Sequence, residues 1–160
     1  TAYLGTGSDH AGQLRVYNKE GITSSYLGDG YYQAYNQFGE RTLFLGTGTS
    51  GGGYLRTYNF EGQETMYIGT GADSSGQLRV YDSAGETGTF LGSGYFRTYN
   101  QFGKMTTYLG NGRDGGGYLR TNNKFETETS FLGTNNSNEG LINLNDKFGQ
   151  SFWIRLNKGN

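Results

Sequence analysis

The chain contains no cysteine and no proline, and its 160 residues include one histidine and one tryptophan. The lack of cysteine excludes disulfides and thiolate chemistry and leaves the cellular compartment open. Thirteen basic and 14 acidic residues give a formal net charge of -1, so there is no basic surface for nucleic acid or an anionic membrane. No stretch approaches the ~18 apolar residues of a membrane span. We therefore expect neither nucleic acid binding nor membrane insertion.

The abundant residues are those of strands and turns. Thirty glycines, 14 tyrosines and 10 phenylalanines stand against almost no helical periodicity. Hydrophobic residues make up 32% of the chain, which argues against one large globular core. The composition predicts an all-β protein of about fourteen short strands joined by glycine turns.

The dipeptide Leu-Gly, once Ile-Gly, recurs through the chain in a fixed order of long, short and long spacings that is then repeated. The seven copies begin at Leu4, Leu27, Leu45, Ile68, Leu91, Leu109 and Leu132. Ile68 lies as far from Leu4 as Leu132 lies from Ile68, so a triplet of units has been copied whole. Units this small cannot bury a core alone and must stack on their neighbours.

This spacing predicts two regions. Residues 1–131 form tandem β-hairpin repeats, with units starting near residues 4, 27, 45, 68, 91 and 109. Residues 132–160 lose the tyrosines, gain Trp153 and form a divergent capping repeat that closes the array. Because Thr1 already lies inside a repeat, we expect the chain to be a piece or a processed product of a longer one.

All units but one contain the pattern Asn/Asp-x-x-Gly between two runs of β-favouring residues, which is a hairpin signal. The glycine can take the left-handed conformation that ends a type I turn in a G1 bulge. The turn glycines are Gly21, Gly39, Gly62, Gly85, Gly103 and Gly149. One unit has Glu126 at this position, and there we expect a distorted turn or a shifted register.

Alternation along the strands predicts two faces. We expect an apolar core face with Leu14, Tyr32, Leu55, Leu78, Phe96 and Leu119, and with Tyr26, Phe44, Tyr67, Phe90, Tyr108 and Phe131 opposite them. The other face is expected to carry the arginines, a row of tyrosines and the leucine of each Leu-Gly. Since neither face is plainly polar, another turn of the chain or another chain is expected to cover the second face.

The rows of arginine and tyrosine are the candidate functional residues. They are Arg15, Arg56, Arg79, Arg97 and Arg120, with Tyr17, Tyr35, Tyr58, Tyr81 and Tyr99. One interpretation is a structural cation–π ladder between hairpins, which repetition at every level favours. The alternative is a carbohydrate-binding surface, because tyrosine rings stack on sugar rings and arginine binds hydroxyl and carboxylate groups.

The sequence shows no arrangement of residues that is typical of catalysis. His10 has no repeated serine or acid to partner it, so we interpret it as a plain loop residue and expect a protein that is not an enzyme and needs no cofactor. Asp9, Asp73 and Asp114 in the long loops are the candidates for calcium ligands, although the nine-residue period of calcium-binding repeats is missing.

The three-unit period fits an elongated β-solenoid with three faces, or three chains around one axis, and we favour the homotrimeric β-fibre. Written as aromatic-Leu-Gly-x-Gly, loop, Gly-x-Leu-Arg-x-Tyr-Asn-x-x-Gly, the unit resembles the glycine-rich β-repeat shafts of phage tail fibres and bacterial surface adhesins. The resemblance implies a usually trimeric rod that is extracellular, on the cell surface or on a virion. We therefore expect a shaft segment. The alternatives are a carbohydrate-binding repeat lectin with a cell-surface glycan as partner, and a self-assembling extracellular filament subunit.

Overall fold

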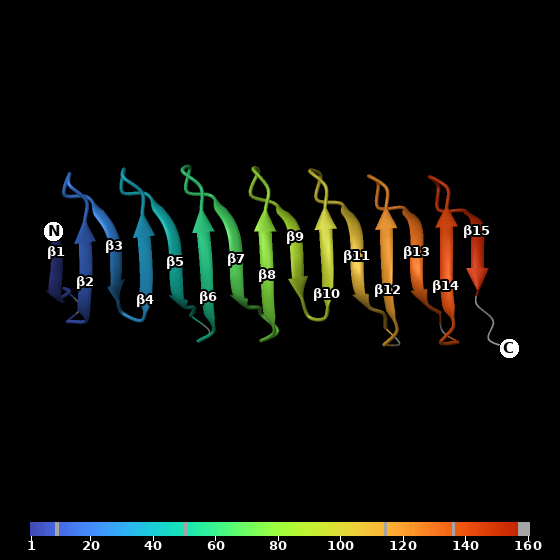
Figure 1. The fold of residues 1–160 in the computed structure, drawn as a ribbon, viewed down its shortest axis with the longest axis horizontal. Helices are drawn as coiled ribbons and strands as arrows, with labels where there is room; N and C mark the ends of the chain where they lie inside the picture. The colour runs from blue at the N-terminus through green and yellow to red at the C-terminus, as the bar shows by residue number, and fades with distance from the viewer. Residues whose placement is uncertain (9, 50, 114, 136, 157–160) are drawn as a thin grey trace. The chain divides into compact units, whose positions relative to one another are not determined.

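The computed structural model describes residues 1–8, 10–49, 51–113, 115–135 and 137–156. Contacts divide the chain into two compact units, Thr1–Gly85 and Glu86–Asn160. Within each unit the strands are antiparallel and pair in chain order, as the alternating arrows of Figure 1 show. The described residues contain no helix, and so none that could span a membrane. The prediction of an all-β array of antiparallel hairpins is confirmed.

The first unit contains β1 (Ala2–Thr6), β2 (Gly12–Tyr17), β3 (Thr23–Gly28), β4 (Tyr31–Tyr35), β5 (Arg41–Thr47), β6 (Gly53–Tyr58), β7 (Glu64–Thr70) and β8 (Gly76–Tyr81). The second unit contains β9 (Thr87–Gly92), β10 (Tyr95–Tyr99), β11 (Met105–Asn111), β12 (Gly117–Asn122), β13 (Glu128–Thr134), β14 (Gly140–Asn145) and β15 (Ser151–Leu156).

The Asn-x-x-Gly turns of each unit lie at one end of its strands and share one geometry. In the turn between β6 and β7, Gly62 has a φ of 78° and its N–H donates to the carbonyl of Asn59 at 3.1 Å. The Asn59 side-chain oxygen accepts from the N–H groups of Glu61 and Gln63 at 3.0 and 2.9 Å. The six predicted turn glycines all have positive φ, between 69° and 85°. The asparagine therefore closes the turn and the glycine provides the left-handed residue that ends it.

The expected distortion at Glu126 is wrong. Glu126 adopts a φ of 66°, and its N–H donates to the Asn123 carbonyl at 3.0 Å as in the glycine turns. Its carboxylate accepts a hydrogen bond from the N–H of Met105 at 3.0 Å and lies 3.4 Å from the Lys104 ammonium. Contacts with the neighbouring turn therefore hold a side chain at a position that favours glycine.

The connections at the other end of the strands account for the two repeat lengths. Long units use a five-residue turn of the same hydrogen-bonding type, in which Gly48 N–H donates to the Gly52 carbonyl at 2.8 Å. Short units use two-residue turns with positive φ at both positions, 48° and 76° at Asp29 and Gly30. Such type I′ turns match the twist of paired strands, so a unit can shorten without a change in its strands.

The predicted division of side chains between the two faces is wrong for half of the strands. Within each unit, a bulge after the Asn-x-x-Gly turns shifts the register: Tyr17 pairs with Thr23, but Val16 pairs with Ser25 and Arg15 with Tyr26. An unshifted ladder would have placed Tyr26 opposite Leu14. Because one extra residue moves every later side chain to the other face, the aromatic residues join the arginines and the leucines of Leu-Gly join Leu14.

The result in each unit is a single layer of strands with two unlike faces. The leucine face, which the sequence predicted to be the core, is open to solvent: Leu27, Leu45 and Leu132 are 53%, 49% and 52% exposed. Among the described residues, Tyr108 is the one buried hydrophobic side chain, at 7% exposure, and it lies on the opposite face. Packing within one chain is therefore concentrated on the arginine side.

Candidate functional site

One face of each sheet carries alternating rings and polar side chains, and we call it the aromatic–arginine face. Its central row in the first unit, in register order, is Tyr3, Arg15, Tyr26, Gln33, Phe44, Arg56, Tyr67 and Arg79. In the second unit the row is Phe90, Arg97, Tyr108, Arg120, Phe131 and Asn143. Four of the five predicted arginines have an aromatic residue of their own unit on both sides in this row, and the fifth, Arg79, follows Tyr67.

The rings of this face form one continuous stack in each unit. In the first unit, the centroids of Tyr26, Tyr31, Phe44, Tyr54 and Tyr67 follow one another at 5.2, 5.4, 5.0 and 5.7 Å. In the second unit, Phe90, Tyr95, Tyr108, Tyr118 and Phe131 follow at 5.1, 5.6, 4.7 and 5.2 Å. Offset stacks of this kind contribute about 0.5–1.5 kcal/mol per pair beyond the burial of area. The stack links successive hairpins across the sheet.

The glycine of Leu-Gly makes room for this stack. A Cβ at Gly46 would come 2.6 Å from the Cβ of Tyr31, and one at Gly110 would come 2.5 Å from the Cβ of Tyr95. The tyrosine before Leu-Gly leans along its own strand, and the Tyr67 hydroxyl donates to the Thr70 carbonyl at 2.7 Å. The repeated dipeptide thus has two functions, since leucine faces one side and glycine lets rings close over the other.

The arginines lie over these rings. The guanidinium carbon of Arg97 is 4.2 Å from the Tyr95 centroid and 5.4 Å from that of Tyr108. Arg56 is 4.8 Å from Tyr54, and its guanidinium is 3.3 Å from the Glu64 carboxylate. The buried Nε atoms of Arg56, Arg97 and Arg120 have no hydrogen-bond partner among the described residues. Each of these guanidinium groups lies within cation–π distance of a tyrosine ring, at 4.8, 4.2 and 5.9 Å.

The predicted tyrosines lie beside the arginines at the Asn-x-x-Gly end of the strands. The ring of Tyr58 lies 4.5 Å from the guanidinium carbon of Arg41, an arginine that the sequence analysis did not select. Burial raises the pKa of the Tyr81 phenol, and the nearby Glu64 carboxylate raises it further. The Tyr17 N–H donates to the carbonyl of Thr1, just before β1, at 2.9 Å, and Tyr99 pairs with Met105 across the sheet.

Asparagine replaces this tyrosine in the last two hairpins. The Asn122 side chain donates to the Met105 carbonyl at 2.9 Å, and the Asn145 side chain donates to the Glu128 carbonyl at 3.2 Å. These bonds reach back to the previous hairpin, so a side-chain hydrogen bond takes over the linking role of a ring.

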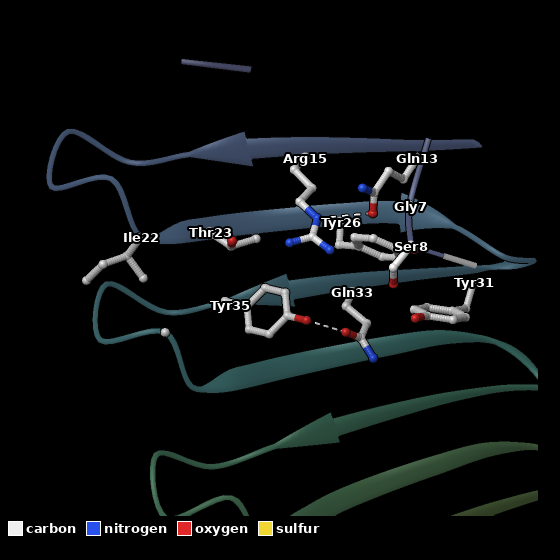
Figure 2. Close-up of a pocket in the computed structure, with 11 residues that line it drawn as sticks. Gly7, Ser8, Gln13, Arg15, Ile22, Thr23, Tyr26, Tyr31, Gln33 and Tyr35 are labelled. Carbon is white, nitrogen blue, oxygen red and sulfur yellow. Dashed lines mark hydrogen bonds between the residues drawn. The ribbon is translucent and has the colours of Figure 1, made fainter. Parts of the chain in front are cut away.

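The regular face is interrupted on strands β2 to β4. Gln33 occupies the position of an arginine, and Gln13 occupies the position that Tyr31 and Tyr54 hold in the ring stack. A hollow of about 480 Å³ lies there, lined by Arg15, Tyr26, Tyr35 and these neighbours. Figure 2 shows Arg15, Tyr26 and Gln33 reaching it from three adjacent strands. Burial raises the pKa of the Tyr31 phenol at its rim, and a hydrogen bond with Tyr26 adds to this effect.

The remaining candidates do not form a site. Trp153 lies on β15 opposite Leu144 and is 42% exposed. His10 has a φ of 67° in its turn, and the Asp73 carboxylate accepts from the N–H and hydroxyl of Ser75 at 3.1 and 2.7 Å. Asp9 and Asp114 lie outside the described residues. Among the residues that are described, no group of three or more His, Asp or Glu could hold a metal ion.

Sequence reasoning found the arginines but missed the ring stack and the hollow. The signal for the hollow was present, because Gln33 and Arg97 occupy equivalent positions in the two copies of the triplet. No protein-family model matches the chain, and no curated protein matches its sequence.

Proposed function

We propose that this chain is a structural shaft segment in which three copies pack their leucine faces around a common axis. The observation that carries the proposal is an exposed, uncharged apolar face that repeats through both units. The resemblance of the hairpin unit to tail-fibre and adhesin shafts supports a fibre that works outside the cell, on its surface or on a virion. No reaction is part of this proposal.

The leucine face of each unit is apolar along its central row. In the first unit the row is Leu4, Leu14, Leu27, Tyr32, Leu45, Leu55, Ile68 and Leu78, and in the second it is Leu91, Phe96, Leu109, Leu119, Leu132 and Ile142. Arg155 on β15 is the first charged residue in it. A continuous apolar surface of this extent marks an interaction site, and its lack of charge suits a second copy of the same surface.

The width of the face favours three sheets over two. On β6 the row order is Gly53, Leu55 and Thr57, and the glycine recurs at Gly12, Gly76, Gly117 and Gly140. On β6 and β12, the large central residue therefore has glycine on one side and threonine on the other. Two stacked sheets keep a spacing of about 10 Å and need large side chains across their whole width. Three sheets around an axis converge at their edges, where glycine and threonine fit, and lie farthest apart at their centres, where leucine reaches the axis.

The aromatic–arginine face would then lie outward, where it needs no partner. Its rings are stacked and its guanidinium groups lie over them within one chain. Each half-exposed leucine that the assembly buries adds roughly 1 kcal/mol, so many small gains accumulate along the repeat. Extension by further units would lengthen such a rod without altering its cross-section.

Molar mass by multi-angle light scattering tests the proposal. We expect three times the 17.5 kDa of the chain. The double variant Leu45→Lys, Leu109→Lys places charges at equivalent leucine-face positions that are 49% and 52% exposed in the single chain, and it should be monomeric. The control Phe60→Lys, Phe102→Lys makes the same change at exposed turns and should leave the trimer intact. A monomeric or dimeric parent protein would overturn the trimer.

A further inference from the structure

The hollow on β2 to β4 lies where two packing rules of the aromatic–arginine face are broken side by side. Gln13 ends the ring stack at Tyr26, as Gln77 in the other triplet copy ends it at Tyr67, and Gln33, which has Arg97 as its counterpart, shortens the arginine row between Arg15 and Arg56. Both changes replace a large side chain by a smaller amide. The space that results, about 480 Å³, falls within the ~300–1,000 Å³ typical of small-molecule sites.

The equivalent position in the second copy of the triplet shows what normally fills this space. Arg97, the counterpart of Gln33 in that copy, lies over the rings of Tyr95 and Tyr108 at 4.2 and 5.4 Å. A structural ladder keeps the same residue at its levels, as at Arg56 and Arg120, and besides Gln33 it is Asn143 of the divergent last repeat that departs from arginine in the described rows. A departure at one level removes a ladder contact, so it calls for a reason of its own, and a ligand site provides one.

The groups that line the hollow combine ring faces with hydrogen-bonding side chains. Arg15 donates from Nε to the Gln13 side-chain oxygen at 3.1 Å, and its guanidinium carbon is 5.4 Å from the Tyr26 centroid. The Gln33 oxygen accepts from the Tyr35 hydroxyl, which holds the amide in place (Figure 2). The hydroxyl donor thereby orients the Gln33 amide so that its nitrogen can donate to a ligand.

The described side chains give the hollow a positive charge. Arg56 in the same row pairs with Glu64 at 3.3 Å, whereas no described carboxylate lies within ion-pair distance of Arg15. The described residues that line the hollow include no aspartate or glutamate. A guanidinium of this kind has outward-facing N–H groups that can bind a carboxylate with two parallel hydrogen bonds.

From this arrangement we infer that the hollow binds a carboxylated pyranose, a sugar of the uronic acid class. Tyr26, at the end of the ring stack, offers a ring face for the C–H surface of the sugar, Arg15 binds its carboxylate, and Gln33 donates to a ring hydroxyl. The site goes beyond the shaft function and does not rest on it, because the hollow lies on the opposite face of the sheet from the leucines.

Calorimetric titration with methyl β-D-glucuronide and methyl β-D-glucoside tests the inference, since the two probes differ only at C6, which is a carboxylate in the first and a hydroxymethyl group in the second. We expect a dissociation constant on the order of 1 mM for the glucuronide and binding at least about tenfold weaker for the glucoside. Gln33→Arg restores the arginine of the other units and should abolish binding of both probes. Arg15→Gln should remove the preference for the glucuronide.

Lys19→Gln is the matched control, because it removes one positive charge from an exposed turn of the same unit, and it should leave both affinities unchanged. Acetate should fail to displace the glucuronide. No binding of the glucuronide, equal binding of the two probes, or undiminished binding by Gln33→Arg would each overturn the inference. Light scattering on the same samples separates this outcome from failure of the shaft proposal, since a trimer that binds no sugar leaves the shaft intact.

Discussion

Gly110 lies directly opposite Tyr95 on the neighbouring strand, and a Cβ on the glycine would come 2.5 Å from the Cβ of the tyrosine. The residue before Tyr95 gives no extra room, because the Gly94 carbonyl oxygen would lie 2.8 Å from the same added Cβ. The sequence repeat and the ring stack therefore depend on each other. The glycine of Leu-Gly leaves the space that the tyrosine on the neighbouring strand occupies.

Gly110→Ala should lower the free energy of unfolding by about 1–3 kcal/mol, because the methyl group meets backbone and a ring-bearing carbon that cannot move apart. Chemical denaturation monitored by tyrosine fluorescence measures the change. Gly117→Ala is the control, since a Cβ there meets nothing within 4 Å of the single chain, and in the monomeric Leu45→Lys, Leu109→Lys background it should change stability by less than about 0.5 kcal/mol. Equal effects of the two substitutions would contradict this account of the dipeptide.

Arg97→Ala should destabilise the protein by about 0.5–2 kcal/mol through the loss of its contacts with Tyr95 and Tyr108. A chain of this size should show a decrease in melting temperature of about 2–4 °C for each kcal/mol. Arg113→Ala removes an exposed turn arginine and should leave the melting temperature unchanged. An unchanged melting temperature for Arg97→Ala would show that the ladder is not structural.

The hairpins could be predicted from the sequence because their determinants are local. Asn59 and Gly62 begin and end one four-residue turn, and the hydrogen bonds they make involve residues in or next to that turn. The same is true of the repeat boundaries, which Leu-Gly marks directly. Neither requires knowledge of how one strand lies against another.

The faces could not be predicted because a one-residue bulge decides them. The skipped residue between Thr23 and Ser25 moves Tyr26 from the side of Leu14 to the side of Arg15. Nothing in the alternation along β3 alone reveals this shift, since both of its faces carry apolar residues. The hollow at Gln33 depends on the same register, which sets Gln33 in the row of Arg15 and Arg56.

The Glu126 carboxylate should make stability sensitive to acid. Its hydrogen bond from the Met105 N–H and the nearby Lys104 ammonium lower the pKa of this carboxyl in the folded protein. A lowered folded-state pKa gives stability that is fully present above the unfolded-state value of about 4.3 and is lost as the pH falls through the folded-state pKa. The denaturation midpoint should therefore decrease as the pH is lowered from neutral to acidic values.

Glu126→Gln keeps an acceptor for Met105 but loses the ion pair, so it should be less stable at neutral pH and show a shallower decline with acid. Glu61→Gln, in the equivalent exposed turn of the first unit, should follow the parent curve. Parallel curves for Glu126→Gln and the parent would show that this carboxylate does not contribute to the acid response.

Assembly through the leucine face also predicts that the stability of the protein depends on its concentration. If three chains fold together, dilution favours the unfolded chains by mass action, and the melting temperature should rise with protein concentration. Differential scanning fluorimetry across a hundredfold range of about 1 to 100 µM covers the expected change. Leu45→Lys, Leu109→Lys should melt at a lower temperature that no longer depends on concentration, whereas Phe60→Lys, Phe102→Lys should keep the dependence of the parent. A concentration-independent melting temperature in the parent would mean that the open leucine face is stable alone, and self-assembly would then have no stabilising role.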